Sequence, residues 1–266
     1  MTPVKEGQLY LSRLILNPRS RQVWSELAQP YEMHKTLMRA FPIVSGDEGI
    51  KAREKFGVLF RADEDDRLGR VIVYVQSTVE PDWSFMELLH DYLLDESERP
   101  NLASKDVAKT YERLRNGQIL SFRLRANPTR KIDTKSGPDG QRRAGKRVEL
   151  QGEEEQISWL IRKGKEREKK EPGGFEIVMM EVIGRDGKVL RVPSLNVYPE
   201  GKLQGRKREE ESPHKTTHMA VRFEGLLRIT DAGAFRETLA RGIGGAKAFG
   251  FGLLSVAPIG QANHAD

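Results

Sequence analysis

The sequence predicts an α+β fold in which one order of elements occurs twice. Alternating apolar residues indicate strands, and apolar residues three or four positions apart indicate helices. In the first half these patterns predict strands over 8–16, 57–61 and 70–76 and helices over 19–28, 30–42 and 84–92. The second half shows the order strand, helix, strand, strand, helix, strand. The chain is therefore predicted to hold two tandem ferredoxin-like (RRM-like) βαββαβ domains.

A polar stretch near the middle of the chain sets the domain boundaries. Residues 95–110 are polar and contain Pro100, so we expect an N-terminal domain over 1–100, a linker over 101–116 and a C-terminal domain over 117–266. The second domain is predicted to contain strands over 117–125, 217–230 and 251–256, a hairpin over 175–192 and helices over 153–162 and 231–241. Residues 198–215 are poor in apolar side chains and are expected to form a mobile loop.

The composition indicates a protein with a large polar surface. Of its 266 residues, 37% are hydrophobic and 32% are charged, and the net charge is +6. The absence of cysteine excludes disulfides, thiolate zinc sites and a cysteine nucleophile. The sequence has no run of 18 apolar residues and no apolar signal-peptide region near Met1. We therefore expect a cytoplasmic protein without a membrane partner.

The predicted helix over 30–42 holds a histidine placed to act in catalysis. Pro30 suits a first helical position and Pro42 ends the run. A step of about 100° per residue puts His34 at the edge of an apolar stripe formed by Met33, Leu37, Ala40 and Phe41. Tyr31, Lys35 and Arg39 fall on the polar side. Partial burial and nearby cations lower a histidine pKa, which would leave the ring neutral and able to transfer a proton. The alternative is a boundary histidine without a catalytic role.

A basic segment predicts a nucleic-acid surface. Residues 123–147 contain nine basic residues and two acids, Asp133 and Asp139. The local net charge of +7 therefore exceeds the net charge of the whole chain. Such a block neutralises phosphates, and the deep, narrow major groove of duplex RNA concentrates phosphate charge. The alternative is a solvated charge run. The basic residues are Arg123, Arg125, Arg130, Lys131, Lys135, Arg142, Arg143, Lys146 and Arg147.

A glycine-rich segment over 242–252 has two interpretations. It includes Gly244, Gly245 and Lys247 but lacks the ending of a phosphate-binding P-loop, and it follows a helix, which is the wrong order for a dinucleotide-binding fingerprint. Glycines let a backbone approach a phosphate closely, and they also permit a tight connection between packed domains. Both roles are open on the sequence alone.

The remaining histidines show no recognisable spacing for a metal site. His90 is expected to be structural, His214 and His218 lie in or after the predicted loop, and His264 is in the tail. None forms a ligand pattern with Asp or Glu. We therefore expect neither a metal nor a cofactor.

Five motifs together resemble the CasE family, the endoribonuclease of type I-E CRISPR systems. They are LNPRSR at 16–21, PYEMH at 30–34, EPDWS at 80–84, FRLRANP at 122–128 and GIGGAKAFGFGLLS at 242–255. The resemblance spans nearly the whole chain and implies two ferredoxin-like domains. It also implies metal-free cleavage of CRISPR repeat RNA at the base of a stem-loop, followed by retention with other subunits in the Cascade complex.

The resemblance also implies roles for individual residues. The catalytic histidine falls on His34 and its neighbouring tyrosine on Tyr31. The resemblance and the basic pattern together predict RNA or phosphate contacts from Lys35, Arg39, Arg123, Arg125, Arg130, Lys131, Arg142, Arg143, Gly244, Gly245 and Lys247. Segments 43–55 and 163–170 depart from the family pattern. Two other functions stay open, a non-catalytic RNA-binding protein, although the RRM aromatic signature is absent, and a purely structural subunit.

Overall fold

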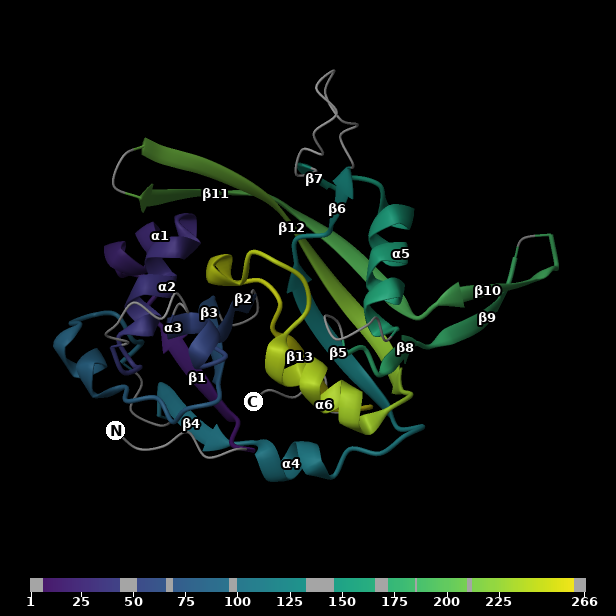
Figure 1. The fold of residues 1–266 in the computed structure, drawn as a ribbon, viewed down its shortest axis with the longest axis horizontal. Helices are drawn as coiled ribbons and strands as arrows, with labels where there is room; N and C mark the ends of the chain where they lie inside the picture. The colour runs from purple at the N-terminus through teal and green to yellow at the C-terminus, as the bar shows by residue number, and fades with distance from the viewer. Residues whose placement is uncertain are drawn as a thin grey trace, which may run out of the picture.

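The computed structural model describes residues 7–43, 52–65, 69–95, 100–132, 146–165, 172–184, 186–209 and 212–260. Side chains are described in these ranges except over 205–215. Figure 1 shows an N-terminal α+β domain beside a larger C-terminal one. No helix in the described part of the chain is long and apolar enough to span a membrane.

The N-terminal domain contains a four-stranded antiparallel sheet. Its strand order, β2-β3-β1-β4, is that of a ferredoxin-like unit. The elements are β1 (Tyr10–Leu16), α1 (Arg21–Ala28), α2 (Pro30–Met38), α3 (Ala52–Lys55), β2 (Leu59–Asp65), β3 (Arg70–Ser77), the 3₁₀ helix η1 (Ser84–Leu88) and β4 (Leu102–Asp106).

The C-terminal domain repeats this strand order as β11-β12-β5-β13, with β8 also pairing with β12. Two further hairpins, β6–β7 and β9–β10, form separate two-stranded sheets. The elements are β5 (Ile119–Ala126), β6 (Thr129–Ile132), β7 (Lys146–Glu149), α5 (Glu153–Gly164), β8 (Phe175–Ile177), β9 (Met179–Ile183), β10 (Val189–Pro193), β11 (Leu195–Glu209), β12 (Ser212–Ile229), α6 (Ala232–Arg241), η2 (Lys247–Phe249) and β13 (Leu254–Pro258). The prediction of an α+β protein with two tandem ferredoxin-like domains is confirmed.

Three predicted segments differ in the structure. The helix predicted over 84–92 is only the 3₁₀ turn η1. The segment 101–116, expected as a linker, includes β4, which pairs with β1 and completes the N-terminal sheet. The prediction of a loop over 198–215 is wrong, because residues 198–209 and 212–215 belong to the paired strands β11 and β12. Backbone pairing forms such a ribbon without an apolar core, so its polar composition did not reveal it.

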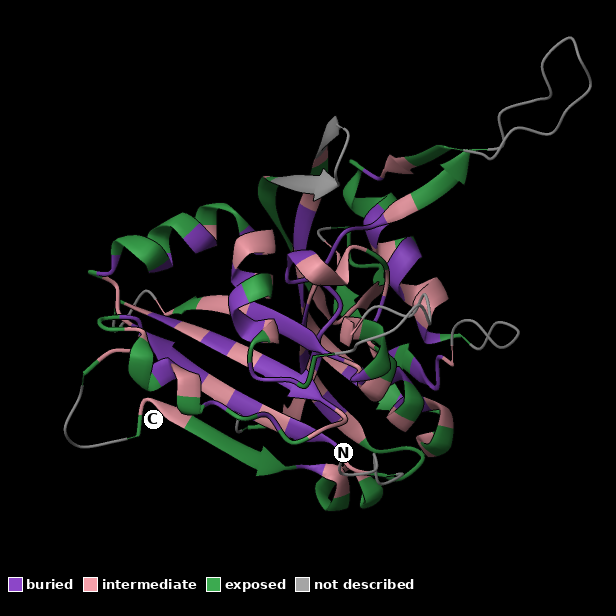
Figure 2. Ribbon diagram, turned by 60° about the vertical axis from the view of Figure 1, so that its left-hand side comes forward, coloured by how far each residue is buried: buried purple, intermediate pink, exposed green. Residues whose placement is uncertain are grey.

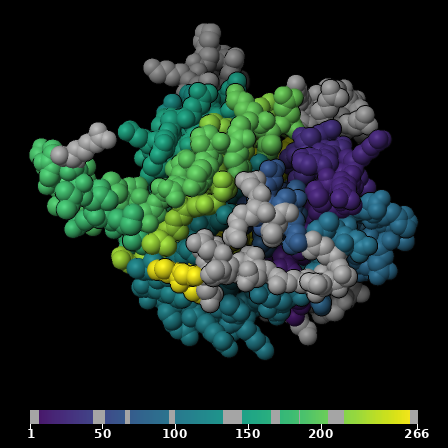
Figure 3. Space-filling view, turned by 180° about the vertical axis from the view of Figure 1, so that it is seen from behind, coloured from purple at the N-terminus to yellow at the C-terminus, as the bar shows by residue number. Residues whose placement is uncertain are grey.

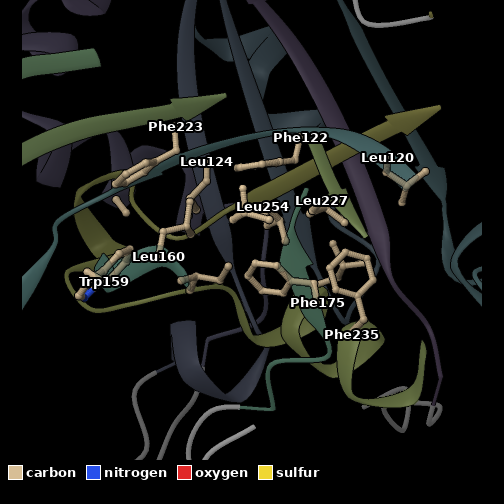
Figure 4. Packing of buried hydrophobic residues seen from close by; sticks show 14 of the residues in the cluster. Leu120, Phe122, Leu124, Trp159, Leu160, Phe175, Phe223, Leu227, Phe235 and Leu254 are labelled. Carbon is tan, nitrogen blue, oxygen red and sulfur yellow. The ribbon is translucent and has the colours of Figure 1, made fainter. Parts of the chain in front are cut away.

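Helix α2 forms where the apolar periodicity predicted it. Pro30 occupies a first-turn position, and Met33 and Leu37 are buried against the N-terminal core. Figure 2 shows buried and partly buried residues alternating along the central strands, as expected for sheets covered on one face. In the C-terminal domain, strand residues such as Phe122 and Phe223 pack with Trp159 of α5 and Phe235 of α6 (Figure 4). Each domain therefore has its own core.

A buried arginine of the N-terminal domain binds the C-terminal domain. Arg61 on β2 is 2% exposed and pairs with Asp63 at 2.7 Å. Its Nη1 donates hydrogen bonds to the carbonyl oxygens of Arg123 and Leu253 and to Ser255 Oγ, at 3.0–3.2 Å. Burial alone would raise the pKa of Asp63, but Arg61 and then Arg123 outweigh burial and lower that pKa. The two domains are thus joined through a buried charge.

The glycine-rich segment makes the second contact between the domains. Figure 1 shows the loop between α6 and β13 lying beside α2 and β2, which both contact η2. Gly242 ends α6 at a φ of +71°, and a Cβ there would lie 2.6 Å from the Gly252 carbonyl oxygen and 2.7 Å from Leu59 Cδ1. Gly250, at φ +79°, packs against Phe60 in the same way. The structure confirms the interpretation of this segment as a tight connection between packed domains.

Arg61→Ala should lower the free energy of unfolding by about 3–5 kcal/mol, the usual cost of removing one partner from a buried ion pair. Urea denaturation would measure the change. Arg228→Ala is the matched control, because Arg228 pairs with Glu176 at the surface and both side chains are about half exposed. The control should lose less than about 1 kcal/mol. Equal losses would contradict a special role for Arg61.

Gly242→Ala should destabilise the protein by about 1–3 kcal/mol, because alanine is strained at this φ and its Cβ meets backbone. Gly245→Ala is the control, since a Cβ there meets nothing within 4 Å. The expected drop in Tm is several degrees for Gly242→Ala and close to zero for Gly245→Ala, measured by thermal unfolding. Identical Tm values for the two variants would argue against the tight interface.

Candidate active site

His34 lies on α2 between aromatic rings from two elements. Its ring is 5.8 Å from that of Tyr31, one turn earlier on the helix, and 6.2 Å from Phe60 of β2, to which it is nearly parallel at 7°. Tyr31 in turn lies 5.7 Å from Phe249 of η2. The predicted pair Tyr31 and His34 is therefore brought together at the contact between the two domains.

Burial holds the His34 ring neutral. The pKa of His34 is lowered to about 4, first by burial and then by the positive charge of Arg53. Its Nδ1 atom is buried and has no hydrogen-bond partner among the described residues. Because Nδ1 has no accessible surface, a proton exchanged with a bound ligand must pass through Nε2. The site thus offers an uncharged imidazole at neutral pH.

One cation, Arg53, acts electrostatically on this histidine. Arg53 of α3 lowers the pKa of His34 and also that of Lys247 on η2, so its charge acts on both. Burial is the larger cause of the lowered Lys247 pKa, and Lys247 Nζ donates a hydrogen bond to the Arg241 carbonyl oxygen at 2.6 Å. Lys247 was predicted from the glycine-rich segment. Arg53 was not, because it lies in a segment that departs from the family pattern and only the fold brings it close.

Lys35 of α2 and Arg39, which follows its last residue, were also predicted to contact RNA, and their side chains lie in different places. Lys35 forms an exposed pair with Glu32 at 2.8 Å and lies 5.2 Å from the centre of the Tyr31 ring. The Arg39 guanidinium instead lies over Phe85 of η1, at 4.4 Å from the ring centre. Lys35 is therefore beside the Tyr31 and His34 pair, whereas Arg39 covers an aromatic ring of its own domain.

The two strand arginines of the basic segment are held by carboxylates. Arg123 pairs with Glu224 at 2.7 Å and with Asp63 at 3.3 Å, and Arg125 pairs with Glu200 at 2.6 Å. Arg222 pairs with Glu200 and Glu224 as well. The three arginines, Asp63 and Glu200 line a cleft of about 340 Å³. The sequence between residues 123 and 147 could not reveal these ion pairs, because the carboxylates come from strands that are distant in sequence.

The remaining basic residues lie on the β6–β7 hairpin. Arg130 and Lys131 are exposed on β6, and Arg130 makes a long, exposed pair with Glu155 at 3.3 Å. Arg147 on β7 lies 3.3 Å from Thr129 Oγ1. Arg142 and Arg143 fall outside the described residues. This hairpin therefore carries the part of the basic segment that the sheet does not neutralise.

A cleft of about 550 Å³ runs along the glycine-rich segment. Gly244, Gly245 and Lys247 line it, as does Arg147. His218 of β12 lies in its wall, with Nδ1 at 2.9 Å from Asn127 Nδ2 and its ring 4.5 Å from Phe249. Burial lowers the pKa of His218. The sequence placed His218 just after the predicted loop, in the strand predicted over 217–230, and gave it no functional role; the pairing of β12 places it in this wall.

No group of three or more His, Asp or Glu side chains in the described ranges is arranged to hold a metal ion. The ionisable residue that shifts the His34 pKa is Arg53, which also pairs with Glu54 at 2.8 Å. The arrangement therefore consists of a neutral imidazole, a tyrosine ring and positive charges. Such a site can bind a phosphodiester and move a proton at it.

Comparison with known proteins matches nearly the whole chain. The sequence model of the family described as CRISPR associated protein covers residues 9–258. The CRISPR-associated endoribonuclease Cse3 of Thermus thermophilus is 35% identical, over 94% of this chain and 100% of that protein. The CRISPR system Cascade subunit CasE of Escherichia coli is 28% identical over the same shares.

A solved structure agrees with the sequence comparison. Thermus thermophilus Cse3 bound to an RNA representing a pre-cleavage complex superposes with a TM-score of 0.65 and 32% identity, over 94% of this chain and 100% of that one. The fold, the order of the motifs and both comparisons point the same way. The chain belongs to the CasE/Cse3 family of CRISPR-associated proteins.

Proposed function

We propose that this protein is a metal-independent endoribonuclease that cleaves CRISPR repeat RNA at the base of its stem-loop. It then stays bound to the mature RNA with the other subunits of a Cascade complex. The observation that carries the proposal is His34, held uncharged between Tyr31 and Phe60 and close to Arg53. The 35% identity to an endoribonuclease along nearly the entire chain supports it.

The reaction uses a nucleophile that the RNA itself provides. The 2′-hydroxyl upstream of the scissile phosphate attacks phosphorus and loses its proton. The bond from phosphorus to the 5′-oxygen breaks, and that oxygen gains a proton. The products are a 2′,3′-cyclic phosphate and a 5′-hydroxyl, and neither oxidant nor water is consumed. Because the nucleophile is already part of the substrate, no metal-bound water is needed.

The electrostatics favour His34 as the base. With a pKa of about 4, the ring is uncharged at pH 7 and can accept the 2′-hydroxyl proton through Nε2. Proton transfer of this kind accelerates a reaction by about 10² to 10⁴-fold. Tyr31, which contacts both His34 and Phe249, would orient the imidazole or the ribose.

Positive charge near His34 would stabilise the phosphorane-like transition state. Arg53 is the best placed, because its charge lowers the pKa of His34, and Lys247 is the next candidate, because Arg53 lowers its pKa as well. Lys35, next to Tyr31, can add to this field. Fixed charges aimed at developing negative charge are the largest single contribution in many enzymes. Arg39 has a smaller part in this proposal than the sequence suggested, since it lies over Phe85.

The RNA stem would lie along the β6–β7 hairpin and the cleft beside it. Arg130, Lys131 and Arg147 provide exposed positive charge there, and Gly244 and Gly245 allow the backbone to approach a phosphate. Arg142 and Arg143, which lie between β6 and β7 in the sequence, are proposed as further contacts. Arg123 and Arg125 are weaker candidates, because carboxylates already satisfy them.

His34→Ala should bind a repeat stem-loop with unchanged affinity and cleave it at least about 10²-fold more slowly, because the proton acceptor is lost. His90→Ala is the control, since His90 is exposed outside the site, and it should cleave at the wild-type rate. Single-turnover cleavage of labelled RNA measures the rate, and filter binding measures the affinity. Full cleavage by His34→Ala would refute the role of His34.

EDTA should leave wild-type cleavage unchanged, and a substrate with 2′-deoxyribose at the cleavage nucleotide should resist it. The first result follows from a reaction without metal, the second from the missing nucleophile. Cleavage of the 2′-deoxy substrate would show another mechanism, and inhibition by EDTA would show a metal. Binding without cleavage would instead support a non-catalytic RNA-binding or structural subunit.

The pH dependence separates the two proton roles. His34 gains a proton only as the pH falls through about 4, so a base loses activity there and is fully active above about pH 5.5. The single-turnover cleavage rate, measured with enzyme in excess over RNA, should therefore rise from pH 3.5 and then level off. Arg53→Gln should move the midpoint upwards, because it removes a charge that lowers the His34 pKa. A wild-type rate that falls between pH 5 and 8 would assign the acid role instead.

A further inference from the structure

The β9–β10 hairpin projects from the C-terminal domain. Met179–Ile183 pairs antiparallel with Val189–Pro193, and these strands form a sheet of their own. Figure 1 shows this hairpin at the side of the molecule away from the N-terminal domain, and Figure 3 shows it standing clear of the body from behind. We call residues 179–193 the arm.

The arm exposes an unusual amount of apolar surface. Six of its side chains are 39–80% exposed, namely Met179, Met180, Val182, Ile183, Val189 and Leu190. They form half of the twelve large hydrophobic residues that are exposed in the described part of the chain. Scattered exposed apolar residues are ordinary, but a concentration of this kind indicates a contact surface.

Both faces of the ribbon are apolar. In the observed register Val182 faces Leu190 across the strands, and Met180 faces Val192, so one face carries no polar side chain. The other face places Ile183 opposite Val189 and has one charged pair of positions, Glu181 and Arg191. A partner resting on one face would leave the second face in water. The arm is therefore suited to a groove that encloses it.

The chemistry and size of the arm limit what the partner can be. RNA is a poor fit, because residues 179–193 contain three basic and two acidic side chains and hence little net charge. The exposed apolar area is on the order of 500 Å², which resembles the functional patches of monomers, at about 300–600 Å². A stable independent interface buries about 800 Å² on each partner. The arm alone is too small to hold two copies of this chain together.

We infer that the arm inserts into an apolar groove of another protein subunit that is bound to the same RNA. This inference rests on the proposed function, because the shared RNA holds the two proteins together and raises their effective concentration. A contact too small to associate alone becomes stable under that condition. The arm then fixes the position of this subunit in the complex without taking part in cleavage.

The test uses two variants, one for each face of the arm. Val182→Thr with Leu190→Thr changes one face, and Ile183→Thr with Val189→Thr changes the other. Threonine keeps a high strand propensity, so the hairpin should persist. Leu88→Thr with Ile259→Thr is the control, because these residues are 73% and 59% exposed outside the arm.

Each protein is co-expressed with the remaining Cascade subunits of its host and a repeat RNA, and the complex is purified by size exclusion. Each arm variant should be retained at least fivefold less than wild type, while the control is retained fully. Cleavage of the isolated stem-loop and the Tm should be unchanged in all three. Wild-type retention of both arm variants would overturn the inference.

Two other outcomes also decide the matter. If sedimentation shows a wild-type dimer that the arm variants convert to a monomer, the occupant is a second copy and the inference is wrong. If the wild-type protein neither cleaves the RNA nor joins the complex, the proposed function fails and the inference fails with it. If the wild-type protein and both arm variants all assemble normally, the inference about the arm is refuted and the proposed function is not affected.

Discussion

The buried Arg61 side chain is the constraint on which the arrangement of the two domains depends. It is charged, almost fully enclosed, and satisfied only when β2 of one domain meets the backbone of β5 and of the loop before β13 in the other. A separated N-terminal domain would leave this guanidinium with Asp63 alone. Gln76 acts in the same way, since its amide donates to the Leu239 carbonyl oxygen of α6 at 2.8 Å. Polar groups of this kind fix one relative placement, whereas apolar packing tolerates several.

That placement brings the parts of the candidate active site together. His34 and Tyr31 come from the first domain and Lys247 from the second, and Phe249 beside Tyr31 closes the gap between them. The glycines of the segment are needed because the loop passes within van der Waals contact of Leu59 and Phe60. The glycine-rich segment thus serves the packing directly, and in the proposed function it would serve the chemistry through the position of Lys247. Its two interpretations are compatible for this physical reason.

Local patterns predicted the features that depend on neighbouring residues in the sequence. The apolar stripe of α2 and its histidine at the edge follow from helical periodicity, and the helix predicted over 231–241 corresponds to α6. The repeated order of helices and strands was also predicted, because most of the strands alternate apolar and polar residues.

Features that depend on tertiary contacts could not be predicted in this way. Arg53 reaches the site only because α3 folds beside α2, and Arg123 loses its availability only because Asp63 and Glu224 arrive from other strands. The paired strands over 198–209 and 212–215 are held by backbone hydrogen bonds, which amino-acid composition does not reveal. The depth of the shift in the His34 pKa likewise requires the burial that the whole fold provides.

The paired arginines on the sheet have a consequence for how a polyanion reaches the protein. Arg123, Arg125 and Arg222 each face a carboxylate, so this side of the C-terminal sheet has little field of its own. The exposed basic residues of β6–β7 lie elsewhere, and the positive charge is unevenly distributed over the described surface. In the proposed function, an approaching RNA would be oriented by this charge during diffusion, before any contact forms, with its phosphates toward the hairpin. By neutralising the arginines on the sheet, the carboxylates would favour approach of the RNA from the side of the β6–β7 hairpin.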